Sequence, residues 1–298
     1  MNENSLHAVI QSPAKLQFLK GRFNSDNIVH TISYVIFGIW FLFLVGGLGW
    51  VLIASLSTTR EIFSDTLMNT GLHFENYTKV LFGKNLIRYF FNSIMYVFLP
   101  ILLLIFLASP ASYVLSRGVF RGRNFILMLF VAAMAIPAVM LMIPIFINLS
   151  KVNLVNTTSG LVIIYIGISI PFSVFFLTGF FRSLPVTLEE AALIDGAGEV
   201  QTFWKIMFPL AQPGIITICI FNFVSLWNDY FWALIFVNTE NRKTLMLGVE
   251  NILRTMRYTG NWASLFAATM VLFLPTFILY LFLSEKIIAG VTAGSIKG

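Results

Sequence analysis

The chain has 298 residues, of which 58% are hydrophobic and only 11% are charged, and its formal net charge is +6. Soluble domains carry roughly 25% charged residues, so this composition excludes an ordinary soluble enzyme and predicts an integral membrane protein. The basic residues are spread over the segments between apolar runs, which excludes the basic surface that a nucleic-acid-binding protein needs. The single cysteine, Cys219, excludes a disulfide within the chain.

The chain begins with a polar segment, residues 1–30, which is too long and too polar for the n-region of a signal peptide. The apolar run at 31–59 carries no charge and exceeds the roughly 20 residues that a helix needs to cross the hydrocarbon of a bilayer. We therefore predict an uncleaved first span there. The mixed-charge segment 60–88 contains turn residues and is expected to hold one or two short helices.

Five further charge-free runs are long enough to cross a bilayer as helices. The runs are 89–116, 124–150, 152–181, 206–228 and 258–284. They predict spans at about 89–116, 124–150, 158–181, 210–237 and 259–284, with a polar loop at 182–209 and a tail at 285–298. The expected fold class is an all-α membrane protein with six transmembrane helices. Prolines inside these runs predict kinked helices around a path, or are simply tolerated in packed spans. They are Pro100, Pro110, Pro137, Pro144, Pro171 and Pro275.

The short loops between the predicted spans indicate the orientation of the chain. The loop between the second and third spans contains three cations, Arg117, Arg121 and Arg123, whereas the next loop contains only Lys151. Short cytoplasmic loops are enriched in lysine and arginine. This contrast predicts that both termini and the 182–209 loop are cytoplasmic, and that 60–88 and 238–257 lie outside.

The 182–209 loop is the longest strongly polar segment between two membrane-length runs. Thr187 and Glu190 have the spacing of a capping box, so a helix should start at Leu188. Its first turn contains Glu189 and Glu190, which the helix dipole favours there. Helical spacing predicts one face with small residues, made of Leu188, Ala191, Ala192 and Asp195. This helix either lies on lipid headgroups or fits a groove on a partner protein.

Two kinds of chemistry have no residues to perform them. The phosphate loop of ATPases requires the spacing G-x-x-x-x-G-K-[ST], and the nearest stretch, Gly83-Lys84-Asn85, lacks both the upstream glycine and the hydroxyl. The histidines are scattered at His7, His30 and His73, so the sequence contains no set of metal ligands. Any ATP hydrolysis should therefore belong to another subunit.

A solute path is predicted from polar residues in the fourth and fifth spans. A carboxylate inside a span costs roughly 2.5–3.5 kcal/mol at the bilayer centre, so Asp229 should face protein or water. It either lines the path or has a structural role, such as bonding the end of a neighbouring helix. On one helix, the fifth-span residues would form a single stripe, and a second stripe in the fourth span either lines the path or bonds helices together. The stripes are Asn222, Ser225, Asp229 and Trp232, and Tyr165, Ser169 and Ser173.

The polar loop resembles the EAA motif of the membrane subunits of binding-protein-dependent ABC importers. The resemblance rests on Glu190-Ala191-Ala192, then Gly196 after three residues, Ile206 after nine more, and Phe208-Pro209. Phe208 departs from the leucine that is usual in the motif, a conservative apolar change. The sequence from about residue 28 onward is similar to the second permease subunit of the maltose-type carbohydrate group. The supporting stretches are Phe181-Arg182-Ser183-Leu184-Pro185, Trp227-Asn228-Asp229 and the chain end Thr292-Ala293-Gly294-Ser295-Ile296-Lys297-Gly298.

This resemblance implies a type I ABC importer permease fold with a cytoplasmic coupling helix that docks on a partner ATPase. It implies that Glu190 is the polar anchor on that ATPase, that Ala191 and Ala192 permit close approach, and that Asp195 and Gly196 complete the coupling segment, with Gly196 making the bend. The implied partners are a second permease subunit, two ATPase subunits, an extracytoplasmic solute-binding protein and the lipid bilayer. ATP and Mg²⁺ belong to the ATPase, and this chain is expected to bind no cofactor. The tail, with Thr292 and Lys297, either contacts the ATPases or is a frayed terminus.

The function implied by the resemblance is ATP-driven uptake of a sugar or oligosaccharide across the cytoplasmic membrane of a bacterium. In this interpretation the chain is not an enzyme. One alternative is a permease for another solute, such as a polyol phosphate. A membrane-embedded enzyme is the other alternative, but it requires several titratable groups within the spans, and the sequence offers only Asp229.

Overall fold

A computed structural model describes residues 25–64 and 66–295, with side chains from 29 to 285 apart from residue 65. The described chain is mainly helical and has no strand in these ranges, which confirms the all-α fold class. It divides into two compact units, residues 1–53 and residues 54–298.

The described part of the first unit is one long helix, α2 (Ser25–Ser55), which continues two residues into the second unit. The stretch Val29–Ser55 is long and apolar enough to cross a bilayer. Apolar side chains occur on every side of α2, including Tyr34, Trp40 and Phe43. A helix that is hydrophobic all round is suited to lipid or to a packed membrane interior.

The second unit contains the remaining helices. In chain order they are α3 (Thr59–Phe63), α4 (Glu75–Thr78), the π-helix η2 (Lys79–Gly83), α5 (Leu86–Arg117), α6 (Arg123–Met134), α7 (Ala138–Lys151), α8 (Thr158–Ser183), α9 (Thr187–Ile194), α10 (Glu199–Thr202), the π-helix η3 (Phe203–Met207), α11 (Phe208–Leu210), α12 (Gln212–Trp227), α13 (Phe231–Phe236), the 3₁₀-helix η4 (Glu240–Arg242), α14 (Leu245–Thr259) and α15 (Trp262–Ser295).

Four described helices could cross a membrane by length and composition, and two bent pairs raise the number to six if each pair is one span. The single helices are α2, α5, α8 and α15 up to Glu285. The bent pairs are α6 with α7, and α10–α11 with α12.

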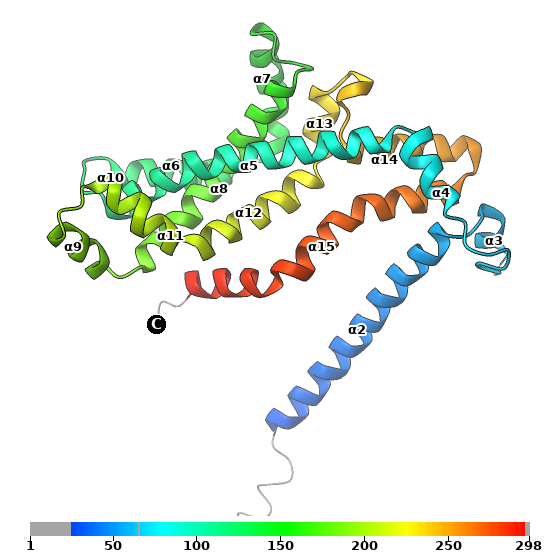
Figure 1. The fold of residues 1–298 in the computed structure, drawn as a ribbon, viewed down its shortest axis with the longest axis horizontal. Helices are drawn as coiled ribbons and strands as arrows, with labels where there is room; N and C mark the ends of the chain where they lie inside the picture. Colours follow the sequence, from blue (N-terminus) through cyan, green and yellow to red (C-terminus); the bar gives the residue numbers. More distant parts are fainter. Residues whose placement is uncertain (1–24, 65, 296–298) are drawn as a thin grey trace, which may run out of the picture. The chain divides into compact units, whose positions relative to one another are not determined.

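The core of the second unit is a bundle of α5, α8, α12 and α15. Helix α5 packs along α8, and α12 lies against α5, α8 and α15 (Figure 1). Gly214 of α12 lies under the Phe180 ring of α8, where an added Cβ would come within 2.6 Å of the ring. The bare glycine therefore allows α12 and α8 to approach each other closely.

The bundle has two ends, which we name after α9 and α14. At the α9 end, Arg117 of α5 donates a hydrogen bond to the carbonyl of Leu184, 2.5 Å away. At the α14 end, Asn92 of α5 donates to the carbonyls of Asn241 and Lys243, each at 2.9 Å. The basic loop after α5 and the polar loop after α8 thus lie at the same end, as the sidedness argument requires.

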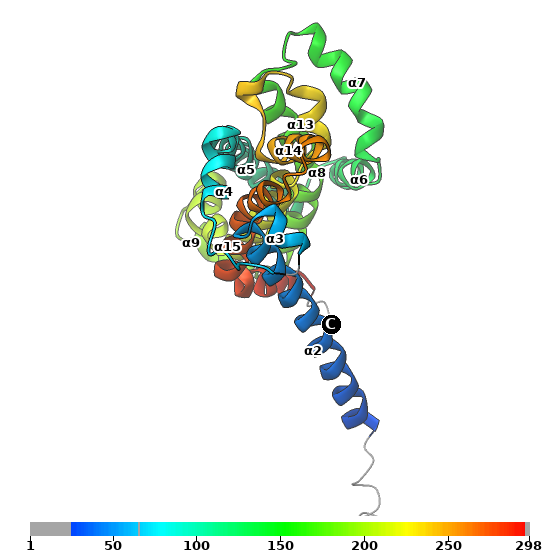
Figure 2. The same ribbon diagram turned by 90° about the vertical axis from the view of Figure 1, so that its right-hand side faces the viewer.

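Residues 124–150 form two helices, α6 and α7, which meet at an angle of 101°. Pro137, with φ −60° and ψ 123°, occupies the break before α7. It lacks an N–H and disfavours helical geometry in the preceding residue. The prolines at 100, 110, 144, 171 and 275 remain inside helices. In Figure 2, α7 lies at the periphery of the second unit, away from α5.

The helix of the predicted fifth span ends at Trp227, and a new helix begins at Phe231. The prediction of one continuous helical stripe from Asn222 to Trp232 is therefore wrong. The physical reason is local, because the carboxylate of Asp229 accepts hydrogen bonds from the backbone N–H groups of Trp232 and Ala233. It satisfies the free donors at the start of α13 and so stabilises a new helix start there.

The segment after α2 contains the short helices α3 and α4, as expected for residues 60–88. Glu61 organises this segment. Its carboxylate accepts hydrogen bonds from the backbone N–H and the hydroxyl of both Thr58 and Thr70. These bonds favour the charged form, and they lower the pKa of Glu61 from 4.5 to about 2.

We expect the fold of this segment to resist acid. A carboxyl group with a lowered pKa stabilises the folded state fully above its unfolded pKa, and this stabilisation disappears as the pH falls through the folded pKa. Cleavage of the segment by pepsin should therefore start only between about pH 4.5 and pH 2. Glu61→Gln should already be cleaved at pH 4.5, whereas Glu75→Gln, which alters an exposed carboxylate, should behave as the wild type. Equal cleavage of the Glu61→Gln variant and the wild type would contradict this role.

Candidate coupling helix and solute cavity

Helix α9 begins at Thr187, one residue earlier than predicted, and the predicted capping box is wrong. The N-cap is Val186, and no side chain bonds the cap. The carbonyl of Val186 instead accepts from the N–H groups of Glu189 and Glu190, at 2.9 and 3.2 Å. Thr187 lies inside the first turn, so its hydroxyl is no longer at the cap position.

The end of α9 is a Schellman turn, in which a left-handed residue closes the last turn of a helix. Gly196 has φ +75°. Its N–H donates to Leu193 at 3.0 Å, and the N–H of Ala197 donates to Ala192 at 2.9 Å. The structure thus shows the glycine bend that the sequence predicts, with the backbone conformation that favours glycine.

The sides of α9 differ in exposure. Ala192 is buried, whereas Glu190, Ala191 and Asp195 are exposed. The most accessible apolar side chains are Leu193, 72% exposed, and Ile194, 86% exposed. The predicted small-residue face is therefore divided: Ala192 packs on its own chain, and Ala191 with the end of the helix faces outward.

The two glutamates of the first turn also differ. The carboxylate of Glu189 lies 2.9 Å from Nε of Arg117, and both side chains are largely buried, with exposed fractions of 19% and 16%. The Nε–H does not point along the line to the oxygen, so the attraction is chiefly ionic. Glu190 has no such partner among the described residues. In the sequence analysis Arg117 served only as one of the loop cations that indicate orientation. Its pairing with Glu189 was not predicted.

A cavity of about 430 Å³ with both polar and apolar lining residues lies among α7, α8, α12 and the start of α13. It contains five of the seven residues of the two predicted stripes. They are Ser169, Asn222, Ser225, Asp229 and Trp232, and the wall is completed by Ala138, Ile168, Phe172 and Phe221. Asp229 and Trp232 line this cavity although the helix breaks after Trp227, so they do not lie on one helical stripe with Asn222.

Tyr165, another residue of the predicted stripes, contacts the cavity residue Asp229. Its hydroxyl, on a side chain that is 1% exposed, donates to Oδ2 of Asp229 at 2.8 Å. Asn222 donates to the hydroxyl of Ser173 at 3.1 Å. The fourth-span stripe was expected either to bond helices together or to line the path. Ser173 bonds α12, and Ser169 lies beside the cavity.

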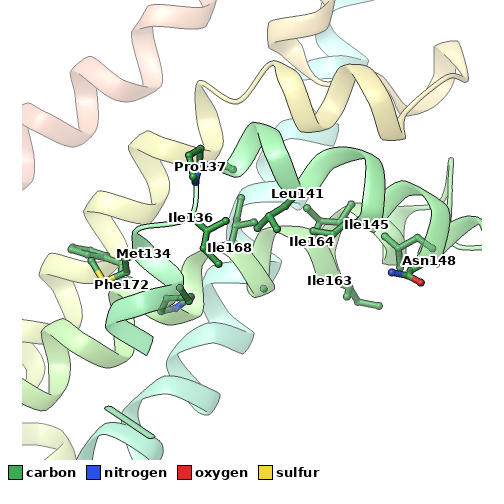
Figure 3. Close-up of a pocket in the computed structure, with 15 residues that line it drawn as sticks. Met134, Ile136, Pro137, Leu141, Ile145, Asn148, Ile163, Ile164, Ile168 and Phe172 are labelled. Carbon is green, nitrogen blue, oxygen red and sulfur yellow. The ribbon is translucent and has the colours of Figure 1, made fainter. Parts of the chain in front are cut away.

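A larger and almost entirely apolar cavity, of about 860 Å³, adjoins the first (Figure 3). It lies between the α6–α7 bend, including Met134 and Pro137, and the α8 residues Ile163 and Ile168. Asn148 is the polar side chain on its wall. A hydroxyl-rich solute needs several hydrogen-bonding groups, so the smaller cavity is the better candidate for solute contact.

The tail contains two residues that were expected to contact the ATPases, Thr292 and Lys297. The backbone of Thr292 belongs to α15, but its side chain lies outside the described residues, as does Lys297. Most of the predicted N-terminal segment, residues 1–24, is also outside them.

Comparison with protein families matches a range of the chain that includes the polar loop. Residues 108–289 match the model of the binding-protein-dependent transport system inner membrane component. The chain belongs to this family. The match includes Arg117, all of α9 and the smaller cavity.

Relatives of this permease align over nearly its whole length. The diacetylchitobiose uptake system permease protein NgcG of Streptomyces coelicolor is 33% identical over 275 residues, which are 92% of this chain and 91% of the relative. The probable starch degradation products transport system permease protein AmyC of Thermoanaerobacterium thermosulfurigenes is 31% identical, over 90% of this chain and 98% of the relative.

A solved structure is similar to the permease in fold. It is a crystal structure of a bacterial ABC transporter involved in the import of the acidic polysaccharide alginate. One of its chains superposes with a TM-score of 0.76 and 25% sequence identity, covering 88% of this permease and 97% of that chain. The type I importer permease fold expected from the sequence is consistent with this similarity.

Proposed function

We propose that this permease is the membrane-spanning subunit of an ATP-driven importer for a sugar or oligosaccharide. The main structural support is α9, a short helix at one end of the membrane bundle. Its residues Glu190, Leu193 and Ile194 are exposed. An exposed apolar tip with a carboxylate beside it suits a partner protein better than water. The family match and the carbohydrate systems of the relatives support the same conclusion.

In this proposal α9 is the coupling helix, and ATP with Mg²⁺ is bound and hydrolysed by a pair of partner ATPases. Glu190, Ala191, Asp195 and Gly196 form the part that meets the ATPase, and Ala192 seats the helix on its own chain. The α9 end of the bundle and both termini face the cytoplasm, in agreement with the positive-inside rule. A second permease subunit completes the path, and an extracytoplasmic solute-binding protein delivers the solute.

The chemistry of the 430 Å³ cavity favours an uncharged sugar over a polyol phosphate. The cavity contains the carboxylate of Asp229, the amide of Asn222 and the hydroxyls of Ser169 and Ser225, and none of its described lining residues is basic. These groups bond sugar hydroxyls, whereas a phosphate would meet a like charge without a cation to balance it.

The proposal is tested by reconstitution in proteoliposomes with the partner permease, the ATPases and the solute-binding protein. We expect ATP hydrolysis to be stimulated by the loaded binding protein, and labelled oligosaccharide to accumulate. Excess unlabelled neutral oligosaccharide should compete, and a polyol phosphate should not. Competition by the phosphate alone would favour the alternative solute, and activity of the isolated permease without an ATPase would contradict the importer.

A further inference from the structure

The side chain of Arg117 joins three segments at the α9 end of the bundle. It belongs to the last residue of α5, it donates to the carbonyl of Leu184 at 2.5 Å, and its Nε lies 2.9 Å from the carboxylate of Glu189. Leu184 follows the last residue of α8, and Glu189 is in the first turn of α9. One guanidinium thus holds the ends of two spans and the start of the exposed helix.

Aromatic packing one turn earlier on α5 makes this junction stiff. The Tyr113 ring lies 5.7 Å from the Phe181 ring of α8 and 5.2 Å from the Phe203 ring of η3, measured between centroids. Phe181 and Phe203 are buried in the apolar core at this end. The end of α5 therefore contacts the segments on both sides of α9.

At its start α9 is joined to α8 through the connection at Leu184–Val186, and further along the helix Ala192 is buried. Leu184 is extended, with φ −73° and ψ 142°, so the chain leaves the helix there. The ion pair adds a direct attachment between α9 and the end of α5.

We propose that Arg117 is a positioning residue that fixes α9 to α5 through Glu189, so that displacement of α9 moves α5 and α8 together. The two glutamates then have separate tasks. Glu189 holds the helix on its own chain, and Glu190, one residue later and exposed, remains available to the ATPase. This inference rests on the proposed function, because it requires α9 to be the helix on which the ATPase acts.

The test uses the complete transporter in proteoliposomes and two readouts. The first is the amount of ATPase that co-purifies with the permease. The second is coupling, measured as ATP hydrolysis stimulated by the binding protein and as the amount of solute transported per ATP hydrolysed. Glu189→Gln should keep the ATPase bound but lower stimulation and transport about fivefold or more, the lower bound of typical coupling between sites. Arg117→Lys should be intermediate, because an ammonium keeps the charge but not the forked geometry.

Matched variants separate this pairing from a general loss of structure. Glu190→Gln should weaken ATPase co-purification, and Glu199→Gln, at an exposed site on α10, should change neither readout. The charge exchange Arg117→Glu with Glu189→Arg should recover part of the coupling that each single reversal removes. Three results would each overturn the inference. They are full coupling in the Glu189→Gln permease, loss of ATPase binding by the Glu189→Gln permease, and no recovery of coupling in the exchange variant. Failure of the unaltered permease to bind any ATPase would instead overturn the proposed function.

Discussion

Gly196→Pro should lower binding-protein-stimulated ATP hydrolysis of the assembled transporter at least tenfold. Gly196 has φ +75°, and proline is confined to φ near −65°. Proline also lacks the N–H that Gly196 donates to Leu193. The Schellman turn cannot form, which costs about 3 kcal/mol or more locally and moves the exposed tip of α9 away from its partner. The measurement is ATP hydrolysis in proteoliposomes with and without loaded binding protein.

Two alanine variants provide the control series. Gly196→Ala keeps the N–H but places a Cβ in the left-handed region, which costs about 1–2 kcal/mol, so an intermediate loss is expected. Gly198→Ala should be close to wild type, because Gly198 has φ −75° and an added Cβ would meet nothing within 4 Å. Normal stimulation together with normal transport in Gly196→Pro would remove the argument that this turn positions the coupling helix.

The membrane fold was predictable because composition alone decides it. A charge-free run of 20 or more residues has few alternatives to a membrane-spanning helix, since only a helix satisfies its own backbone in lipid. Gly196 was predictable for a similar local reason, because glycine after a short polar helix commonly ends it in a left-handed turn. Both inferences need only neighbours in the sequence.

The breaks within spans were not predictable at the level of single residues. Of the prolines at 100, 110, 137, 144, 171 and 275, Pro137 lies at a sharp bend, and the others remain inside helices. Whether a proline bends or breaks a membrane helix depends on which neighbouring groups satisfy the freed carbonyl, and the sequence does not specify these neighbours.

The loop at 182–209 shows the same limit for charged residues. Thr187 and Glu190 matched the capping-box spacing, but the carbonyl of Val186 takes the bonds instead. Arg117 and Glu189 are 72 positions apart in sequence and 2.9 Å apart in space. A pairing across that separation depends on how α5 packs against α8, which a pattern of neighbouring residues cannot indicate.

Asp229→Ala should destabilise the permease by about 2–4 kcal/mol. The substitution leaves the Tyr165 hydroxyl without its acceptor and removes the cap on α13. A lost hydrogen bond to a charged group costs about 1.5–3 kcal/mol, and a lost helix cap about 0.5–2 kcal/mol. The estimate lies in the lower part of this sum because Asp229 is only partly buried. The measurement is the midpoint of thermal unfolding of the purified transporter in detergent.

Tyr165→Phe and Asp229→Asn separate the structural role of this pair from solute contact. Tyr165→Phe removes the buried hydroxyl behind the cavity, so it should lower stability without changing the KM of transport. Asp229→Asn keeps an oxygen to accept from the backbone but removes the charge, so it should cost less stability than Asp229→Ala and raise the KM. An unchanged KM in Asp229→Asn would leave Asp229 with a structural role alone.

The geometry of the carboxylate explains why both roles are expected of one residue. Oδ2 of Asp229 is occupied by the Tyr165 hydroxyl at 2.8 Å and the Ala233 N–H at 3.0 Å. Oδ1 accepts only from the Trp232 N–H among the described residues, at a long 3.4 Å. A carboxylate oxygen offers more than one lone pair, so Oδ1 retains capacity for a solute hydroxyl in the cavity that Asp229 lines. Structural bonds therefore hold one oxygen of Asp229 and leave the other with capacity for a further hydrogen bond.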